Sequence, residues 1–194
     1  MDFTSKVVLI TGAAGGIGQE LVKQFHQNGA TVVLTDLNEE RLKTVVSQYS
    51  ERVHYYACNI GDATQSAELI KKIETEVGTI DILVNNAGLT KDTLMMRMKD
   101  EDWDLVLNVN LSAGFRLARD VIKSMMKKRY GRIISMASVV GVTGNPGQAN
   151  YAASKAGLIA MTKCLAKDNQ RTYFFIRLNH GLCNRYTYFS QTIN

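Results

Sequence analysis

Three side chains whose types and spacing suit proton transfer lie in the second half of the chain. Tyr151 and Lys155 are four residues apart, so a helix there would place them on one face. A tyrosine phenol ordinarily has a pKa of about 10, and a neighbouring ammonium group favours its phenolate form. Such a tyrosine can protonate the alkoxide that forms when hydride reaches a carbonyl. The Tyr-x-x-x-Lys spacing is common, so its meaning depends on its surroundings, which include Ser138 thirteen residues earlier.

A glycine-rich turn follows the first apolar segment and opens a predicted helix. Its residues are Thr11, Gly12, Ala13, Ala14, Gly15, Gly16, Ile17 and Gly18. Glycines let the backbone approach a pyrophosphate closely, and the free N–H groups of a helix N-terminus bind anions. A strand, a glycine turn and a helix in this order are the context that a dinucleotide site requires. The alternative is an ordinary strand–helix turn.

Asp36 ends the second predicted strand, 18 residues after Gly18. A carboxylate at this place accepts hydrogen bonds from the ribose hydroxyls of adenosine, and it repels a 2′-phosphate. The two positions after Asp36 hold Leu37 and Asn38 rather than Arg or Lys, and the glycine turn contains no Arg or Lys either. These residues favour NADH over NADPH. The alternative is that Asp36 only caps the next helix.

Strand-like and helix-like segments alternate along the chain. The predicted strands are 7–11, 31–35, 53–58, 80–84 and 132–136, and the predicted helices are 19–28, 38–50 with Asn38 as its N-cap, 63–77, 100–128 with an interruption near 108–110, and 150–167. The strands are almost continuously apolar, which predicts a parallel sheet covered on both faces. Right-handed crossovers then give a doubly wound, Rossmann-like α/β fold with its ligand site at the carboxyl edge, where Ser138 and 85–88 fall.

The composition is that of a soluble globular domain. The 194 residues are 45% hydrophobic and 21% charged, and no apolar run approaches the ~20 residues that span a bilayer. The N-terminus lacks the basic region of a signal peptide, so we expect a cytoplasmic protein with no membrane partner. The net charge is +5, but no basic run is interleaved with aromatic residues, which argues against nucleic acid.

The cysteines and histidines predict neither a disulfide framework nor a metal site. The three cysteines are widely spaced, and we expect Cys58 and Cys164 to be small buried residues. No two of the three histidines have a metal-ligand spacing, so no metal is assigned.

Together with Asn59, Ile60, Asn85–Gly88 and Asn110, these motifs resemble the short-chain dehydrogenase/reductase family over residues 1–167. The resemblance implies that Tyr151 is the general acid and that Ser138 hydrogen-bonds the substrate carbonyl. It also implies that Lys155 favours the phenolate and holds the nicotinamide ribose, and that Asn110 supports a water linking Lys155 to solvent. The implied cofactor residues are Gly12, Ala13, Ala14, Gly15, Gly16, Ile17, Gly18, Asp36, Leu37, Asn59, Ile60, Asn86, Ala87, Gly88, Tyr151 and Lys155.

Residues 90–100 and 144–151 are similar to the bacterial 3-oxoacyl-acyl-carrier-protein reductases of this family. The implied reaction is hydride transfer from NAD(P)H to a β-keto thioester in fatty-acid elongation. NADPH is the usual cofactor of those enzymes, which conflicts with the inference from Asp36. The resemblance also implies a homotetramer that packs through residues 100–128 and 150–167.

Five basic residues gather near the end of the predicted helix 100–128: Lys123, Lys127, Lys128, Arg129 and Arg132. The resemblance implies that they dock an acidic acyl carrier protein, with Arg129 as the test residue. Interaction with the helix dipole together with solubility is the alternative. For Met95, Met96 and Met98, ordinary packing is preferred to contact with an acyl chain.

The final residues do not match what precedes them. From 168 to 194 there is no Ala, Val, Lys or Glu, and no period of 2 or 3.6 is sustained. The sixth strand that the family carries is not recognisable. We therefore expect one catalytic domain at 1–167 and a frameshifted or replaced tail at 168–194, the alternative being a genuine divergent ending. Three functions remain open: an active reductase of this kind, another short-chain dehydrogenase acting on a small alcohol or ketone, and an inactive cofactor-binding fragment.

Overall fold

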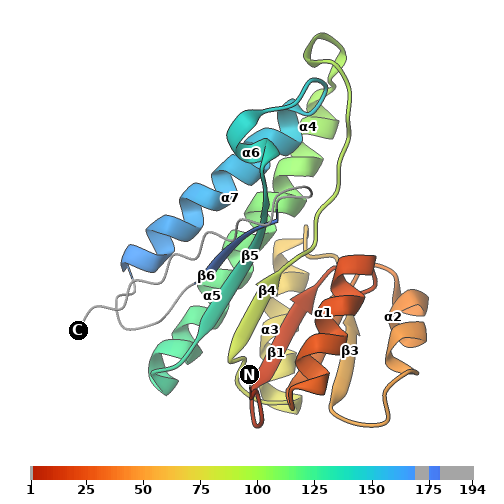
Figure 1. Ribbon diagram of the computed structural model, residues 1–194, viewed down its shortest axis with the longest axis vertical. Coiled ribbons are helices and arrows are strands. Elements are labelled where there is room, and N and C mark those ends of the chain that lie inside the picture. Colours follow the sequence, from red (N-terminus) through yellow and green to blue (C-terminus); the bar gives the residue numbers. More distant parts are fainter. Residues whose placement is uncertain (1, 169–174, 180–194) are drawn as a thin grey trace.

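A computed structural model describes residues 2–168 and 175–179 (Figure 1). Its centre is a six-stranded sheet in the order β3-β2-β1-β4-β5-β6, and every strand pair is parallel. The strands are β1 (Val7–Thr11), β2 (Thr31–Asp36), β3 (Val53–Ala57), β4 (Ile82–Asn85), β5 (Arg132–Ser138) and β6 (Phe175–Asn179). Strand order reverses between β1 and β4, so the predicted doubly wound, Rossmann-like class is confirmed.

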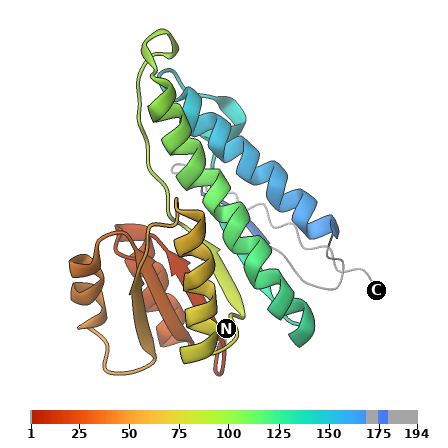
Figure 2. The same ribbon diagram turned by 180° about the vertical axis from the view of Figure 1, so that it is seen from behind.

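Helices cover both faces of this sheet. They are α1 (Gly16–Gln27), α2 (Glu39–Val46), α3 (Ala63–Glu76), α4 (Asp100–Leu107), α5 (Ala113–Lys128), α6 (Val140–Thr143) and α7 (Ala149–Asp168), with a 3-10 turn at Met95–Arg97. Figure 1 shows α1 in front of the strands, and the reverse view in Figure 2 brings α3 and α5 forward. The two layers are the expected product of right-handed crossovers between parallel strands.

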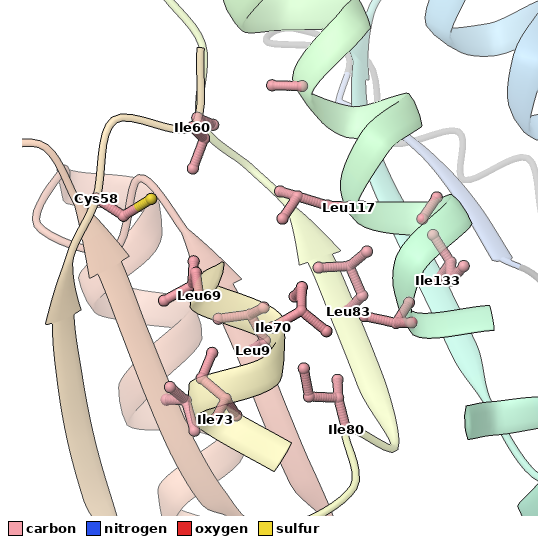
Figure 3. Close-up of a cluster of buried hydrophobic side chains, with 14 of the residues drawn as sticks. Leu9, Cys58, Ile60, Leu69, Ile70, Ile73, Ile80, Leu83, Leu117 and Ile133 are labelled. Atoms are coloured by element: carbon pink, nitrogen blue, oxygen red, sulfur yellow. The ribbon is translucent and has the colours of Figure 1, made fainter. Parts of the chain in front are cut away.

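Alternate residues of the central strands point to opposite faces of the sheet and pack into two separate hydrophobic cores. Leu9, Leu83 and Ile133 face α3 and α5, where they meet side chains such as Ile73 and Leu117 (Figure 3). On the other face, the neighbouring strand residues Val8, Ile10 and Leu34 pack with Val22 of α1 and Leu42 of α2. All of these side chains are fully buried. Burial on both faces explains why the strands read as unbroken apolar runs.

The structure contains a sixth strand that could not be recognised in the sequence. β6 pairs in parallel with β5, with Phe175 opposite Ile134 and Asn179 opposite Ser138. Five residues without a following helical pattern are too short a signal for periodicity to detect. The remaining tail residues, 169–174 and 180–194, lie outside the described residues, as do His180 and Cys183.

Two further expectations need correction. The interruption near residues 108–110 is a π-helical segment at Asn108–Ser112 that joins α4 to α5 without a break. Cys58 is buried as expected, but Cys164 is exposed on α7. Across the part of the chain that the structure describes, no helix combines the length and apolarity of a membrane span.

Candidate active site

A cavity of about 550 Å³ opens at the carboxyl edge of the sheet. Three of its walls come from the ends of β4, β5 and α7, and a fourth comes from Ile17 at the start of α1. The lining residues are Ile17, Asn86, Gly88, Leu89, Thr90, Met136, Ala137, Ser138, Tyr151 and Lys155. The fold therefore brings together Ser138, Tyr151 and Lys155 with the start of the glycine turn's helix. This is the edge where ligands bind in doubly wound sheets.

The wall at the start of α1 is formed by the glycine turn, which packs against the turn after β4. Gly12 has a φ of +62°, and a Cβ at this position would lie 2.8 Å from the Cα of Ala87. The Thr11 hydroxyl oxygen accepts hydrogen bonds from the N–H groups of Asn86 and Ala87 at 3.1 and 3.0 Å. The Asn86 side-chain amide donates to the carbonyls of Thr11 and Gly12 at 2.9 and 3.2 Å. The two turns, 75 residues apart in sequence, thus form one rigid unit.

The same turn has room for a ligand where α1 begins. A Cβ added at Gly16 would meet nothing within 4 Å, whereas one at Gly18 would collide with the Gly12 carbonyl. No side chain caps α1, whose N-cap is Gly15. Helix N-termini leave their first N–H groups without intrahelical partners. Open space beside such free donors fits the pyrophosphate of a dinucleotide, while Gly18 serves close packing.

The side chains of Ala13 and Ala14 are buried in the core, so their contribution to this turn is through the backbone. The Asp36 carboxylate accepts hydrogen bonds from the backbone N–H groups of Ala14 and Asn38, at 3.2 and 3.3 Å. Asn38 is the N-cap of α2, and its side-chain oxygen accepts from the Arg41 N–H at 2.9 Å. The helix α2 is therefore capped by Asn38. Capping this helix was the alternative role considered for Asp36.

Arg41 is a neighbour of this turn that the sequence analysis missed. Its guanidinium Nη2 donates to the carbonyl of Ala14 at 3.2 Å, in the same peptide region that holds Asp36. Basic residues were weighed only at positions 37 and 38 and inside the glycine turn, and Arg41 lies outside both stretches. The available signal was the position of Arg41 in the first turn of the predicted helix 38–50, because that turn lies close to the end of the preceding strand.

The middle of the cavity holds the Ser–Tyr–Lys group. The Lys155 ammonium donates to the Met136 carbonyl at 2.8 Å and lies 5.5 Å from the centre of the Tyr151 ring. Burial lowers the pKa of Lys155 to about 8, because a charged ammonium is poorly solvated there. Ser138 is the last residue of β5 rather than a residue after it, and its oxygen accepts from the Val140 N–H at 3.3 Å.

Asn110 lies behind the Ser–Tyr–Lys group in the π-helical segment, and its side chain is buried. The amide oxygen accepts from the Leu89 N–H and the amide nitrogen donates to the Leu89 carbonyl, both at 2.9 Å. The same nitrogen lies 3.2 Å from the Ser154 hydroxyl. Asn110 thus fastens the strand-end turn to α7, close to Lys155, and π-helical segments often occur at functional sites.

The remaining predicted cofactor residues, Leu37, Asn59 and Ile60, follow the carboxyl ends of β2 and β3. Leu37 is exposed, whereas Ile60 is buried in the core beside Cys58 (Figure 3). The Ile60 side chain therefore points into the core, and its backbone carbonyl accepts from Ser66. The Asn59 side-chain oxygen accepts from the Gly61 N–H at 3.0 Å and shapes this loop. The sequence could not show which part of Ile60 faces the site.

Two groups outside the cavity differ from expectation. Met95 and Met96 are 75% and 87% exposed, so the preferred interpretation, ordinary packing, is wrong for both. Within the basic cluster, Lys128 is bound to Asp81 at 2.6 Å. This ion pair takes one of the five cations away from any docking surface, whereas Arg129 is exposed at the C-cap of α5.

A doubly wound sheet with a glycine turn at its first helix and a cavity at the carboxyl edge is the architecture of a dinucleotide-binding enzyme. The family model described as short chain dehydrogenase matches residues 6–183. The chain belongs to this family and is an NAD(P)-dependent oxidoreductase. The match reaches past residue 167 and includes β6.

Curated relatives are similar over most of the chain. The 3-oxoacyl-acyl-carrier-protein reductase of Rickettsia bellii is 50% identical over 168 residues, which are 87% of this chain and 68% of the relative. The reductase of the same name from Escherichia coli is 45% identical, over 87% of this chain and 69% of its own length. The nodulation protein G of a Rhizobium species is 48% identical over 167 residues, with coverages of 86% and 68%.

Proposed function

We propose that this chain reduces the 3-oxo group of acyl-carrier-protein thioesters to a 3-hydroxy group, as a step of fatty-acid biosynthesis. The observation that carries the proposal is the grouping of Ser138, Tyr151 and Lys155 in one cavity that begins at Ile17 of the dinucleotide turn. Relatives named for this reaction, 45% to 50% identical to the chain, support the choice of substrate.

The chemistry assigns one task to each side chain. Bound NAD(P)H supplies the hydride to the carbonyl carbon. Ser138 donates a hydrogen bond to the carbonyl oxygen, and Tyr151 delivers the proton that converts the developing alkoxide to the hydroxyl. The Lys155 ammonium offsets negative charge on the tyrosine and holds the nicotinamide ribose. Asn110 positions a water that links Lys155 to solvent.

For the adenosine end of the cofactor we retain the role of Asp36 as acceptor from the ribose hydroxyls, which favours NADH. The remaining cofactor contacts come from the backbone of 12–18 and 86–88, with Leu37, Asn59 and Ile60 beside adenine. A comparison of kcat/KM for NADH and NADPH tests this assignment. A strong preference for NADPH would remove the argument from Asp36.

The proposed assembly is a cytoplasmic homotetramer with acyl carrier protein as its substrate carrier. The tetramer would pack through α4, α5 and α7, which present exposed apolar side chains such as Phe115 and Met126 on α5. Arg129 with Lys123, Lys127 and Arg132 would dock the acidic carrier, since Lys128 is held by Asp81. Charge complementarity of this kind acts mainly on encounter rates and specificity.

The catalytic test follows the loss of reduced cofactor with acetoacetyl-coenzyme A. Tyr151→Phe and Ser138→Ala should each lower kcat by roughly 10²–10⁴-fold with little change in cofactor affinity. Tyr130→Phe is the matched control, because Tyr130 lies beside Lys6 and outside the cavity-lining residues. Full activity of Tyr151→Phe would refute the assignment. Turnover with simple ketones but none with the thioester would favour the second function.

A tight cofactor complex without any turnover would favour the third function, an inactive cofactor-binding fragment. The proposed cause is the frameshifted or replaced tail at 168–194, which follows the catalytic domain at 1–167. Reading the coding DNA past the Lys167 codon in the two other frames tests this. A frame that encodes a Val-Asn, a Pro-Gly and a further glycine-rich strand would support a frameshift, and its absence from both frames would count against one.

A further inference from the structure

We propose that Asn150 is a positioning residue: its carboxamide fixes the main chain of Tyr151 and so aims the phenol that delivers the proton. The inference rests on the acid role of Tyr151 in the proposed function, and it names a buried side chain on which that role depends. Asn150 is fully buried and is not among the cavity-lining residues, so it acts through Tyr151 rather than on the substrate.

The first step is the hydrogen bond that Asn150 makes to the next residue. Tyr151 is the third residue of α7, and the first N–H groups of a helix lack intrahelical partners. The Gly147 carbonyl, four residues before Tyr151, accepts instead from the Thr93 N–H at 2.8 Å. The Asn150 side-chain oxygen takes its place and accepts from the Tyr151 N–H at 2.7 Å. A side chain therefore holds this N–H group where the helix offers it no carbonyl.

The second step is the anchorage of the same side chain. The Asn150 amide nitrogen donates to the Lys91 carbonyl at 3.0 Å and lies 3.5 Å from the Asp102 carbonyl. Lys91 belongs to the segment after β4, and Asp102 lies in the first turn of α4, so one carboxamide joins three segments. A buried carboxamide that is bonded through both its oxygen and its nitrogen has a fixed orientation. Such supporting hydrogen bonds are what hold a reacting group in its productive geometry.

The third step concerns the other main-chain group of Tyr151. The Tyr151 carbonyl accepts from the Ser154 hydroxyl at 2.7 Å, and Ser154 lies 3.2 Å from the Asn110 amide nitrogen. Both main-chain polar groups of Tyr151 are therefore bonded to buried side chains. Lys155 is held separately, because its ammonium donates to the Met136 carbonyl of β5 at 2.8 Å. A shift at the start of α7 would thus move the phenol relative to the ammonium.

Gln148 offers a matched control on the same pair of segments. Its side-chain amide donates to the Asp92 carboxylate at 2.8 Å, so it also joins the segment after β4 to the start of α7. This contact is exposed, and the Gln148 side chain bonds to Asp92 and Asn145 rather than to Tyr151. Activity that depends only on joining the two segments would therefore fall equally in Gln148→Ala and Asn150→Ala.

The kinetic experiment follows the loss of reduced cofactor with acetoacetyl-coenzyme A. Asn150→Ala should lower kcat by roughly 10- to 100-fold and leave KM within about twofold, because it misplaces the acid without removing a substrate contact. Gln148→Ala should keep kcat within about twofold of wild type. Asn150→Asp keeps an acceptor for the Tyr151 N–H at a helix N-terminus, where negative charge is favourable, so it should recover part of the loss. In a Tyr151→Phe background, Asn150→Ala should cause no further loss, since the two changes remove one function.

A spectroscopic readout separates this inference from the proposed reaction. With tyrosine isotope-labelled at Cζ, nuclear magnetic resonance detects the phenol carbons, and the Tyr151 signal is the one lost in Tyr151→Phe. This signal should shift in Asn150→Ala and stay in place in Gln148→Ala. An unchanged Tyr151 signal in Asn150→Ala, or equal kinetic losses in the two alanine variants, would overturn the positioning role. An inactive wild type whose Tyr151 signal responds to Asn150→Ala alone would refute the proposed reaction and leave the positioning role intact.

Discussion

The Lys128 ammonium nitrogen lies 2.6 Å from a carboxylate oxygen of Asp81, whose side chain is fully buried at the amino edge of the sheet. The other carboxylate oxygen accepts a hydrogen bond from the Val7 N–H at 3.0 Å. Asp81, the residue just before β4, thus ties the end of α5 to the first residue of β1. A buried carboxylate requires such partners, because its desolvation is otherwise costly.

The first prediction is that Lys128→Ala lowers the free energy of unfolding by about 2–3 kcal/mol, since it leaves Asp81 buried without its ion-pair partner. Urea denaturation followed by circular dichroism provides the measurement. Lys127→Ala, which removes the same charge one residue earlier at an exposed position, should change stability by less than about 0.5 kcal/mol. Equal effects of the two variants would contradict the structural role of the pair.

The second prediction concerns the buried Lys155. Its pKa is lowered to about 8, so the ammonium loses its proton as the pH rises through that value. The ammonium form supports the tyrosine, and kcat/KM should therefore fall above about pH 8. A pH–rate profile with acetoacetyl-coenzyme A measures this effect. A flat profile up to pH 9.5 would show that the charge on Lys155 is not needed.

The same pKa predicts a change in stability with pH. In the unfolded chain a lysine stays protonated up to about 10.5, whereas the folded chain releases the proton near 8. The unfolded state thus binds more protons between these values, and the free energy of unfolding rises with pH across that window. Lys155→Met should remove this contribution. The difference between wild type and variant isolates it from other alkaline titrations, and a constant difference from pH 7 to 10 would contradict it.

The third prediction is that Gly88→Ala impairs catalysis without unfolding the protein. A methyl group there would lie 3.3 Å from the Asn110 side-chain oxygen, which must therefore shift by a few tenths of an ångström, and it would come into van der Waals contact with Lys155 Nζ at 3.4 Å. Displacements of reacting groups on this scale lower rates by roughly tenfold or more. Steady-state kinetics and thermal denaturation should show a large fall in kcat with a small change in Tm. An unchanged kcat would mean that the Asn110–Lys155 arrangement tolerates this crowding.

The fourth prediction tests the docking of acyl carrier protein. Arg129→Glu reverses an exposed charge at the end of α5 and should raise KM for the carrier-bound substrate by about tenfold. It should spare acetoacetyl-coenzyme A, which lacks the carrier. Lys23→Glu, an equal charge reversal on α1, is the control, because α1 covers the opposite face of the sheet from α5. Equal losses with both substrates in Arg129→Glu would refute docking at this position.

Much of the fold was predictable because it depends on local periodicity. The boundaries of β1 agree with its unbroken apolar run, and the Asn38 cap of α2 was evident from one side chain at a helix start. Helix α1 begins at Gly16 rather than Gln19, since the glycines suited both a turn and a first helical turn. The short β6 and α6 were missed because four or five residues carry no usable period.

The sequence by itself determined the order of strands and helices, the glycine turn, and the shared helical face of Tyr151 and Lys155. These features rest on spacing within a few residues, which amino-acid type and helical geometry specify directly. The tertiary structure alone decided that Arg41 reaches a residue 27 positions earlier and that Lys128 is bound to Asp81, 47 positions away. Such pairs depend on how the sheet packs its turns and helices, and no local pattern encodes that packing.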